Sequence, residues 1–113
     1  MTKARMDWKR MTLELDGHAN SAPFGFDIIC AAESMLTQAL LQTLLDMESE
    51  GRLGLEWTGS PEKGFLHVEA APKEEHRAEV TACFRVAVTG LRMLEENYPQ
   101  YINLREEGKD GNV

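Results

Sequence analysis

The chain has 113 residues, of which 42% are apolar and 27% charged, and these proportions are typical of one folded soluble domain over residues 1–113. A formal net charge of −7 argues against nucleic acid bound on a broad basic face and permits a basic partner. No apolar run approaches the roughly 18 residues of a membrane span, and no apolar signal core follows the N-terminus. We therefore expect a cytoplasmic protein with no membrane partner.

Residues 4–9 and 11–16 alternate apolar and polar side chains, which predicts two strands of a hairpin or one long strand. The apolar positions are Ala4, Met6, Trp8, Met11, Leu13 and Leu15. Residues 18–26 include Pro23 and Gly25, which exclude regular structure, so we expect a loop there. A helix from about residue 28 to about residue 47 follows, with Asp27 as its N-cap and Gly51 after its end.

The second half of the chain predicts a hairpin, a helix and a short strand. Residues 53–57 and 66–70 alternate around a turn over 59–64. Pro72 is expected to open the second helix, and Pro99 to end it. Its expected apolar face contains Val80, Phe84, Ala87, Leu91, Leu94 and Tyr98. A last strand over 101–104 is followed by a charged tail, 105–113, which we expect to fray.

These elements predict a two-layer α+β domain, with a mixed sheet of four to five strands and two amphipathic helices on one sheet face. The other sheet face would need cover. Together with the small size of the chain, this favours a homodimer.

The first helix carries Cys30 on its polar side. The residues three, four, seven and eight positions later, which share that side, are Glu33, Ser34, Thr37 and Gln38. The expected buried stripe lies on another side and consists of Ile29, Ala32, Leu36, Ala39, Leu40 and Leu44. A cysteine in an amphipathic helix is usually a small core residue, but these polar neighbours indicate a reactive thiol. Cys83, by contrast, has apolar helical neighbours and is expected in the core.

A reactive Cys30 would have a suitable environment at the helix start. Asp27 as N-cap puts Cys30 at about the third helical position, where unpaired N–H groups favour a thiolate and could hold an oxyanion. His18, at the end of the second strand, could serve as its base. Gly17 and Gly25 let backbone approach a ligand closely, and the loop between them could act as a lid.

For several other residues the sequence gives weaker evidence of a function in catalysis or binding. Phe24 and Phe26 could contact an apolar substrate segment, or could anchor the loop to the core. Ser34 is expected to hydrogen-bond near the thiol or back to the helix. His67 and His76 are expected at the surface. The chain has no Cys-x-x-Cys or His-Glu-x-x-His motif, so we expect no metal and no cofactor.

Two segments together resemble the ribosomal-processing cysteine protease family, Prp. They are Gly17-His18-Ala19 and Asp27-Ile28-Ile29-Cys30-Ala31-Ala32 with Ser34, and the likeness continues in Gly90-Leu91 and in residues 95–101. The resemblance implies a small α+β homodimer that removes a short N-terminal extension from protein twenty-seven of the large ribosomal subunit. By position, Cys30 would be the nucleophile and His18 the base, with Asp27 and Ser34 as supporting residues.

The chain departs from this family at two positions. Asn20 stands where glycine is usual, and Glu33 replaces a usually apolar residue beside the first helical turn. These departures leave open a binding module that holds a ribosomal-protein tail without cutting it. A thiol redox or acyl-transfer enzyme that uses Cys30 alone is a second alternative, and the lack of a Cys-x-x-Cys pair weighs against it.

Overall fold

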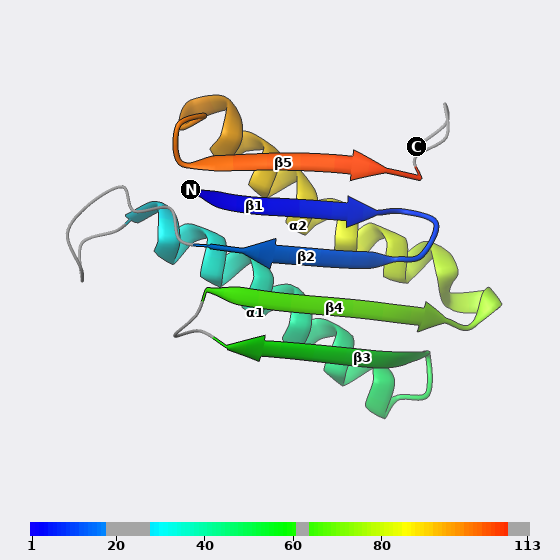
Figure 1. The fold of residues 1–113 in the computed structure, drawn as a ribbon. Helices are drawn as coiled ribbons and strands as arrows, with labels where there is room; N and C mark the ends of the chain where they lie inside the picture. Colours follow the sequence, from blue (N-terminus) through cyan, green and yellow to red (C-terminus); the bar gives the residue numbers. More distant parts are fainter. Residues whose placement is uncertain (18–27, 61–63, 109–113) are drawn as a thin grey trace.

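The computed structural model describes residues 1–17, 28–60 and 64–108. Figure 1 shows five strands and two long helices. In chain order the elements are β1 (Thr2–Asp7), β2 (Thr12–Asp16), α1 (Ile28–Ser49), β3 (Leu53–Ser60), β4 (Phe65–Pro72), a 3-10 turn η2 (Glu74–His76), α2 (Arg77–Asn97) and β5 (Ile102–Glu107).

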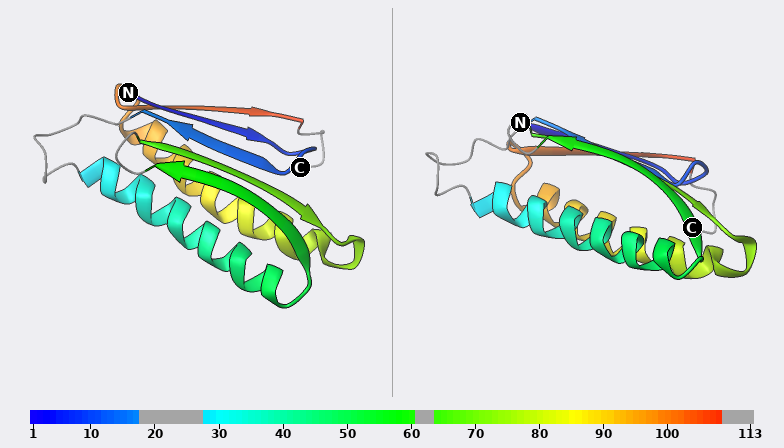
Figure 2. Two further views of the ribbon diagram at one scale, coloured as in Figure 1. Left: turned by 60° about the horizontal axis from the view of Figure 1, so that its bottom comes forward. Right: turned by 90° about the horizontal axis from the view of Figure 1, so that it is seen from below.

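The strands form one mixed sheet in the order β3-β4-β2-β1-β5. The β1–β2, β2–β4 and β3–β4 pairs are antiparallel, and β1–β5 is parallel. Both helices lie against the same face of this sheet (Figure 2). The predicted two-layer α+β architecture is therefore confirmed, and the first two segments form a hairpin rather than one long strand.

The inner sheet face supplies half of the core. All six apolar positions predicted for the first hairpin are buried: Ala4, Met6, Trp8, Met11, Leu13 and Leu15. Strand alternation places them on one face, where they pack against Leu44 of α1 and against Phe84 and Leu91 of α2.

Helix α1 buries a different line of residues from the one predicted. Its buried side chains are Ile29, Glu33, Thr37, Leu40, Leu44 and Met47. They follow one another at steps of three or four and so make a continuous line along the helix. Ala39, expected in this line, is exposed, and Leu36 is half-buried instead. A Cβ placed on Gly90 would lie 2.6 Å from Leu36 Cδ2, so Leu36 is directed toward α2 rather than toward the sheet.

Helix α1 is also long and apolar enough to meet a membrane-span criterion. An 18-residue window within it reaches a mean hydropathy of 1.4, although no apolar run within the helix exceeds five residues. Core helices of soluble proteins meet the same criterion. Here the buried line of α1 packs on the sheet.

The boundaries of α2 correct two predictions. Pro72 is the last residue of β4, where it pairs with Leu53, and the chain makes a 3-10 turn before the helix starts at Arg77. Tyr98 lies beyond the helix end and is 43% exposed, whereas Val88, which was not predicted, is fully buried.

Residues 105–107 do not fray as predicted, because they continue β5. Arg105, Glu106 and Glu107 pair in parallel with residues 5–7 of β1. The pairing is supported by side chains, since Arg5 Nη2 lies 2.7 Å from Glu107 Oε1 and Trp8 Nε1 donates to Glu106 Oε1 over 3.0 Å. Residues 109–113 lie outside the part that the structure describes.

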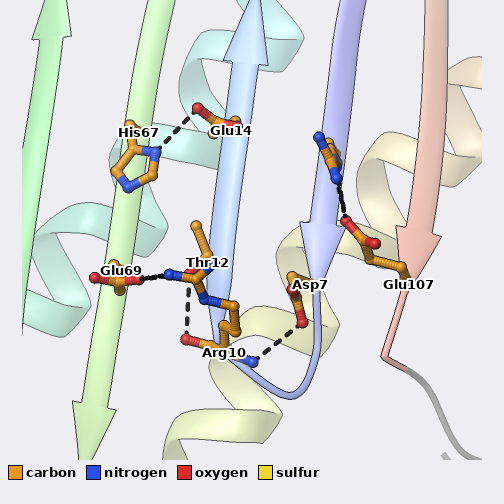
Figure 3. Close-up of a pocket in the computed structure, with 8 residues that line it drawn as sticks. Asp7, Arg10, Thr12, Glu14, His67, Glu69 and Glu107 are labelled. Atoms are coloured by element: carbon orange, nitrogen blue, oxygen red, sulfur yellow. Dashed lines mark hydrogen bonds and ion pairs between the residues drawn. The ribbon is translucent and has the colours of Figure 1, made fainter.

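The outer face of the sheet is charged. Figure 3 shows His67 Nδ1 beside Glu14 at 3.1 Å and Arg10 beside Glu69 at 3.7 Å, around a hollow of about 160 Å³. His67 thus lies on the solvent side, as predicted. A face of paired charges is stable in water, so the prediction that this face needs cover is wrong. The homodimer itself remains a prediction.

Candidate active site

A cleft of about 470 Å³ opens between the start of α1 and the end of the sheet where β2 finishes and β3 turns into β4. This volume is within the usual range for ligand sites. Its described lining residues are Thr2, Leu15, Gly17, Cys30, Glu33, Ser34, Thr37, Gln38, Leu41, Trp57, Gly59, Ser60, Gly64, Phe65 and Leu66. The polar side of α1 that the sequence singled out is therefore the wall of a cleft.

Cys30 is the third residue of α1 and lines this cleft. Its side chain is half-buried and belongs to no disulfide. The first turn of a helix has N–H groups without acceptors inside the helix, so a thiol here has backbone donors close by. Ser34, one turn further along, is exposed and lines the same cleft.

Glu33 lies on the same wall and is only 5% exposed. Its Oε2 accepts a hydrogen bond of 2.9 Å from the hydroxyl of Thr2, at the start of β1. The hydroxyl of Thr37 in turn donates to the Glu33 carbonyl over 3.0 Å. The sequence did not predict a buried carboxylate here, although its position three residues after Cys30 could have suggested one.

Gly17 holds the end of β2 against β1 and the β3–β4 turn. Its φ is +99°, and an added Cβ would lie 2.6 Å from the Met1 carbonyl oxygen. Its N–H donates to the Gly64 carbonyl over 2.8 Å. Only glycine fits this close approach and this backbone conformation, so these contacts fix Gly17 beside the cleft.

The β3–β4 hairpin forms the facing wall, and Trp57 is its exposed inner-face aromatic side chain, at 46%. Phe65, which is 36% exposed, is in register with Asp16 and Ser60 and so alternates onto the outer sheet face. Alternation correctly puts Trp57 on the inner sheet face, but the inner face opens into the cleft at this point, so the side chain is not buried.

Several predicted site residues lie outside the described part of the chain. They are His18, Asn20, Phe24, Gly25, Phe26 and Asp27. Among the residues that are described, no group of three or more His, Cys, Asp or Glu side chains could hold a metal ion.

Cys83 lies on α2, away from the cleft lining. It packs against the core as a half-buried residue rather than a fully buried one, with its Sγ 3.9 Å from Met47 Sδ. Burial raises the pKa of the Cys83 thiol, and the negative charge of Glu79 raises it further.

The fold and the cleft together define a small α+β protein with a helix-borne thiol at the candidate site. A family model described as cysteine protease Prp matches residues 1–103. The chain therefore belongs to the Prp family of cysteine proteases, and the resemblance drawn from its motifs is confirmed. No curated protein sequence matches the chain.

Solved structures share this fold. The essential ribosomal processing protease Prp from S. aureus, in complex with a covalently linked product peptide, is 19% identical, with a TM-score of 0.80 over 95% of this chain and 100% of that one. The same protease with a substrate peptide is 18% identical, with a TM-score of 0.73 over 95% and 100%. SMU.848 from Streptococcus mutans is 24% identical, with a TM-score of 0.66 over 94% and 91%.

Proposed function

We propose that this cysteine protease is an endopeptidase that removes a short N-terminal extension from protein twenty-seven of the large ribosomal subunit, with Cys30 as nucleophile and His18 as base. The observation that carries the proposal is the Cys30 thiol, placed in the first turn of α1 and lining a cleft. The S. aureus protease of the same fold is named as a ribosomal processing protease, and one of its two structures holds a substrate peptide.

The proposed reaction has two halves. His18 accepts the proton of the Cys30 thiol, and the thiolate attacks the scissile carbonyl carbon while N–H groups of the first turn of α1 hold the oxyanion. The carbon–nitrogen bond breaks as protonated His18 gives its proton to the leaving amine. Water, deprotonated by His18, then hydrolyses the thioester and restores the thiol.

The cleft also suggests how the peptide is held. Trp57 on the facing wall offers aromatic surface to apolar side chains of the substrate. Phe24 and Phe26 are proposed to add to it. Asp27 and Ser34 are proposed to support the thiol and its base, with Gly17 and Gly25 permitting close backbone approach. We further propose that the protein is cytoplasmic and acts as a homodimer, without cofactor.

A cleavage assay tests this function. Purified protein is mixed with a peptide that spans the extension junction of its own organism's ribosomal protein, and the products are followed by mass spectrometry. We expect one cut, which Cys30→Ala and His18→Ala both abolish. Cys83→Ser is the matched control, because it removes a thiol outside the cleft lining, and it should cleave like the wild type. Cleavage by Cys30→Ala would disprove the assignment.

The alternative is a module of the same fold that binds a ribosomal-protein tail without cutting it. Glu33 favours this alternative, since it puts a carboxylate where the family is usually apolar. In that case the wild type would bind the peptide and leave it intact over the course of the assay, and Cys30→Ala would bind equally well.

A further inference from the structure

The outer edge of strand β3 lies beside the cleft. Of the five strands that the structure describes, β3 is outermost on its side and pairs with β4. Figure 2 shows that α1 and β3 diverge from their connection toward the cleft. The residues that line the cleft come from both elements: Cys30, Gln38 and Leu41 of α1, and Trp57 and Gly59 of β3. The cleft is therefore a groove between a helix and a sheet edge.

The hydrogen bonds between β3 and β4 show which backbone groups of β3 point outward. The Lys73 N–H donates over 3.0 Å to the carbonyl of Arg52, the residue before β3, so Arg52 directs its carbonyl to the β4 side. Pro72, which has no N–H, is opposite Leu53. Backbone groups alternate in direction along a strand. The N–H and C=O groups of the odd-numbered residues of β3 therefore point away from β4.

One part of this outer edge is covered by α1. The Leu55 N–H donates to Glu48 Oε2 over 3.0 Å, and a covered edge does not pair with another chain. Trp57 and Gly59 follow in the part of the edge that lines the cleft. Each of them directs an N–H and a C=O group outward, so this part of β3 presents the hydrogen-bonding pattern of an open strand edge.

The side chains at this edge leave room for an extended chain. Gly59 is exposed and has no side chain, and a Cβ placed on it would lie 3.8 Å from Trp57 Cζ3. Leu41 is half-buried on the α1 side of the groove. A strand paired with β3 would lie about 4.8 Å from it and would direct every second side chain to the inner face. Those side chains would enter the groove between Trp57 and Leu41.

We propose that the substrate peptide binds as an added strand on the outer edge of β3, with its main chain hydrogen-bonded to Trp57 and Gly59. Main-chain bonds of this kind give affinity, and side-chain pockets give specificity. Here Trp57 and Leu41 select an apolar residue of the peptide. The groove continues to the wall that carries Cys30, so a peptide paired with β3 leads to the thiol. The proposal rests on the function proposed above, because it takes the ligand to be a peptide.

N-methyl scanning of the peptide tests this mode of binding. Each amide of a fluorescein-labelled junction peptide is methylated in turn, and its Kd for the Cys30→Ala protein is measured by fluorescence anisotropy, which requires no cleavage. A methyl group removes one donor and blocks the approach to β3. We expect the Kd to rise about tenfold at two amides that are two residues apart, and less than about threefold at the amide between them.

Gly59→Pro is the corresponding test on the protein. Proline is tolerated in an edge strand where the missing N–H would face outward, and its loss as a donor should raise the Kd about fivefold. Gly59→Ala adds the same Cβ and keeps the N–H, so it should raise the Kd less. Thr58→Ala is the control on the outer sheet face, and it should bind the peptide like the parent protein.

Several results would overturn the proposal. They are equal Kd values for Gly59→Pro and Gly59→Ala, a methyl scan without the two-residue period, and no measurable binding of the unmethylated peptide. Losses at several successive amides would indicate a helical peptide in the groove instead. A scan with the expected period, combined with a wild type that cuts no peptide, would disprove the proposed cleavage and leave the edge pairing standing. Cleavage combined with a flat scan would give the reverse result.

Discussion

At the scale of single residues, the two cysteines have different surroundings. Cys30 lines the cleft, whereas Cys83 packs beside Met47, and its burial, followed by the charge of Glu79, raises its pKa. Because the thiolate is the species that reacts, Cys83 should be slow at neutral pH. We predict that iodoacetamide at pH 7 modifies Cys30 at least about tenfold faster than Cys83, as measured by peptide mass spectrometry over time.

The control for this prediction is the unfolded chain. In concentrated urea the two thiols lose their environments and should react at similar rates. Equal slow rates in the folded protein would show that Cys30 is not activated.

Residue periodicity predicted which residues share the side of α1 that lines the cleft, but not how deeply each side chain is buried. Helical spacing places these polar neighbours on the side of Cys30. The burial of Glu33 could not be read from the sequence, since it depends on Thr2, 31 positions away along the chain. The exposure of Trp57 likewise depends on the cleft, which only the assembled layers create.

At the scale of elements, Glu106 connects three parts of the fold. Its carboxylate accepts from Trp8 Nε1 over 3.0 Å and from Arg92 Nη2 over 2.7 Å. Glu106→Ala leaves both donors without this acceptor, and we predict a loss of about 1–3 kcal/mol in the free energy of unfolding, measured by urea denaturation.

Glu107→Ala is the matched control, one residue along the same strand. Its ion pair with Arg5 is about half exposed on both sides, so its loss should cost clearly less stability than the loss of Glu106. Equal losses for the two variants would mean that Glu106 does not hold the elements together as the contacts indicate.

Hairpins and helices were predicted more fully than β5. Alternation and turn residues act locally, so both hairpins could be found from the sequence. The last strand pairs in parallel with β1, about a hundred residues earlier, and no local pattern records that pairing. Its charged residues, 105–107, therefore looked like a tail.

At the scale of the whole molecule, the layers were predicted and the exposed surfaces were not. Only a few arrangements let two amphipathic helices and five strands bury their apolar faces in one core. The arrangement with both helices on one sheet face is one of these. The apolar or charged character of each exposed surface depends on all the residues that face outward from that layer. The outer sheet face is charged (Figure 3), whereas the helix layer exposes Met35, Val86 and Met93 at 67%, 72% and 58%.

These three side chains surround the contact between the helices. Val86 and Met93 lie one turn on either side of Gly90, and Met35 precedes Leu36, whose side chain approaches Gly90.

If the protein is a homodimer, an apolar surface is the one that association would bury. We therefore predict that the helix layer forms the interface. The double variant Val86→Glu, Met93→Glu should be monomeric by sedimentation equilibrium, because burying two carboxylates from each protomer there is unfavourable. Thr58→Glu, on the outer sheet face, should remain dimeric. Dissociation by Thr58→Glu with retention of the dimer in the double variant would place the interface on the sheet instead.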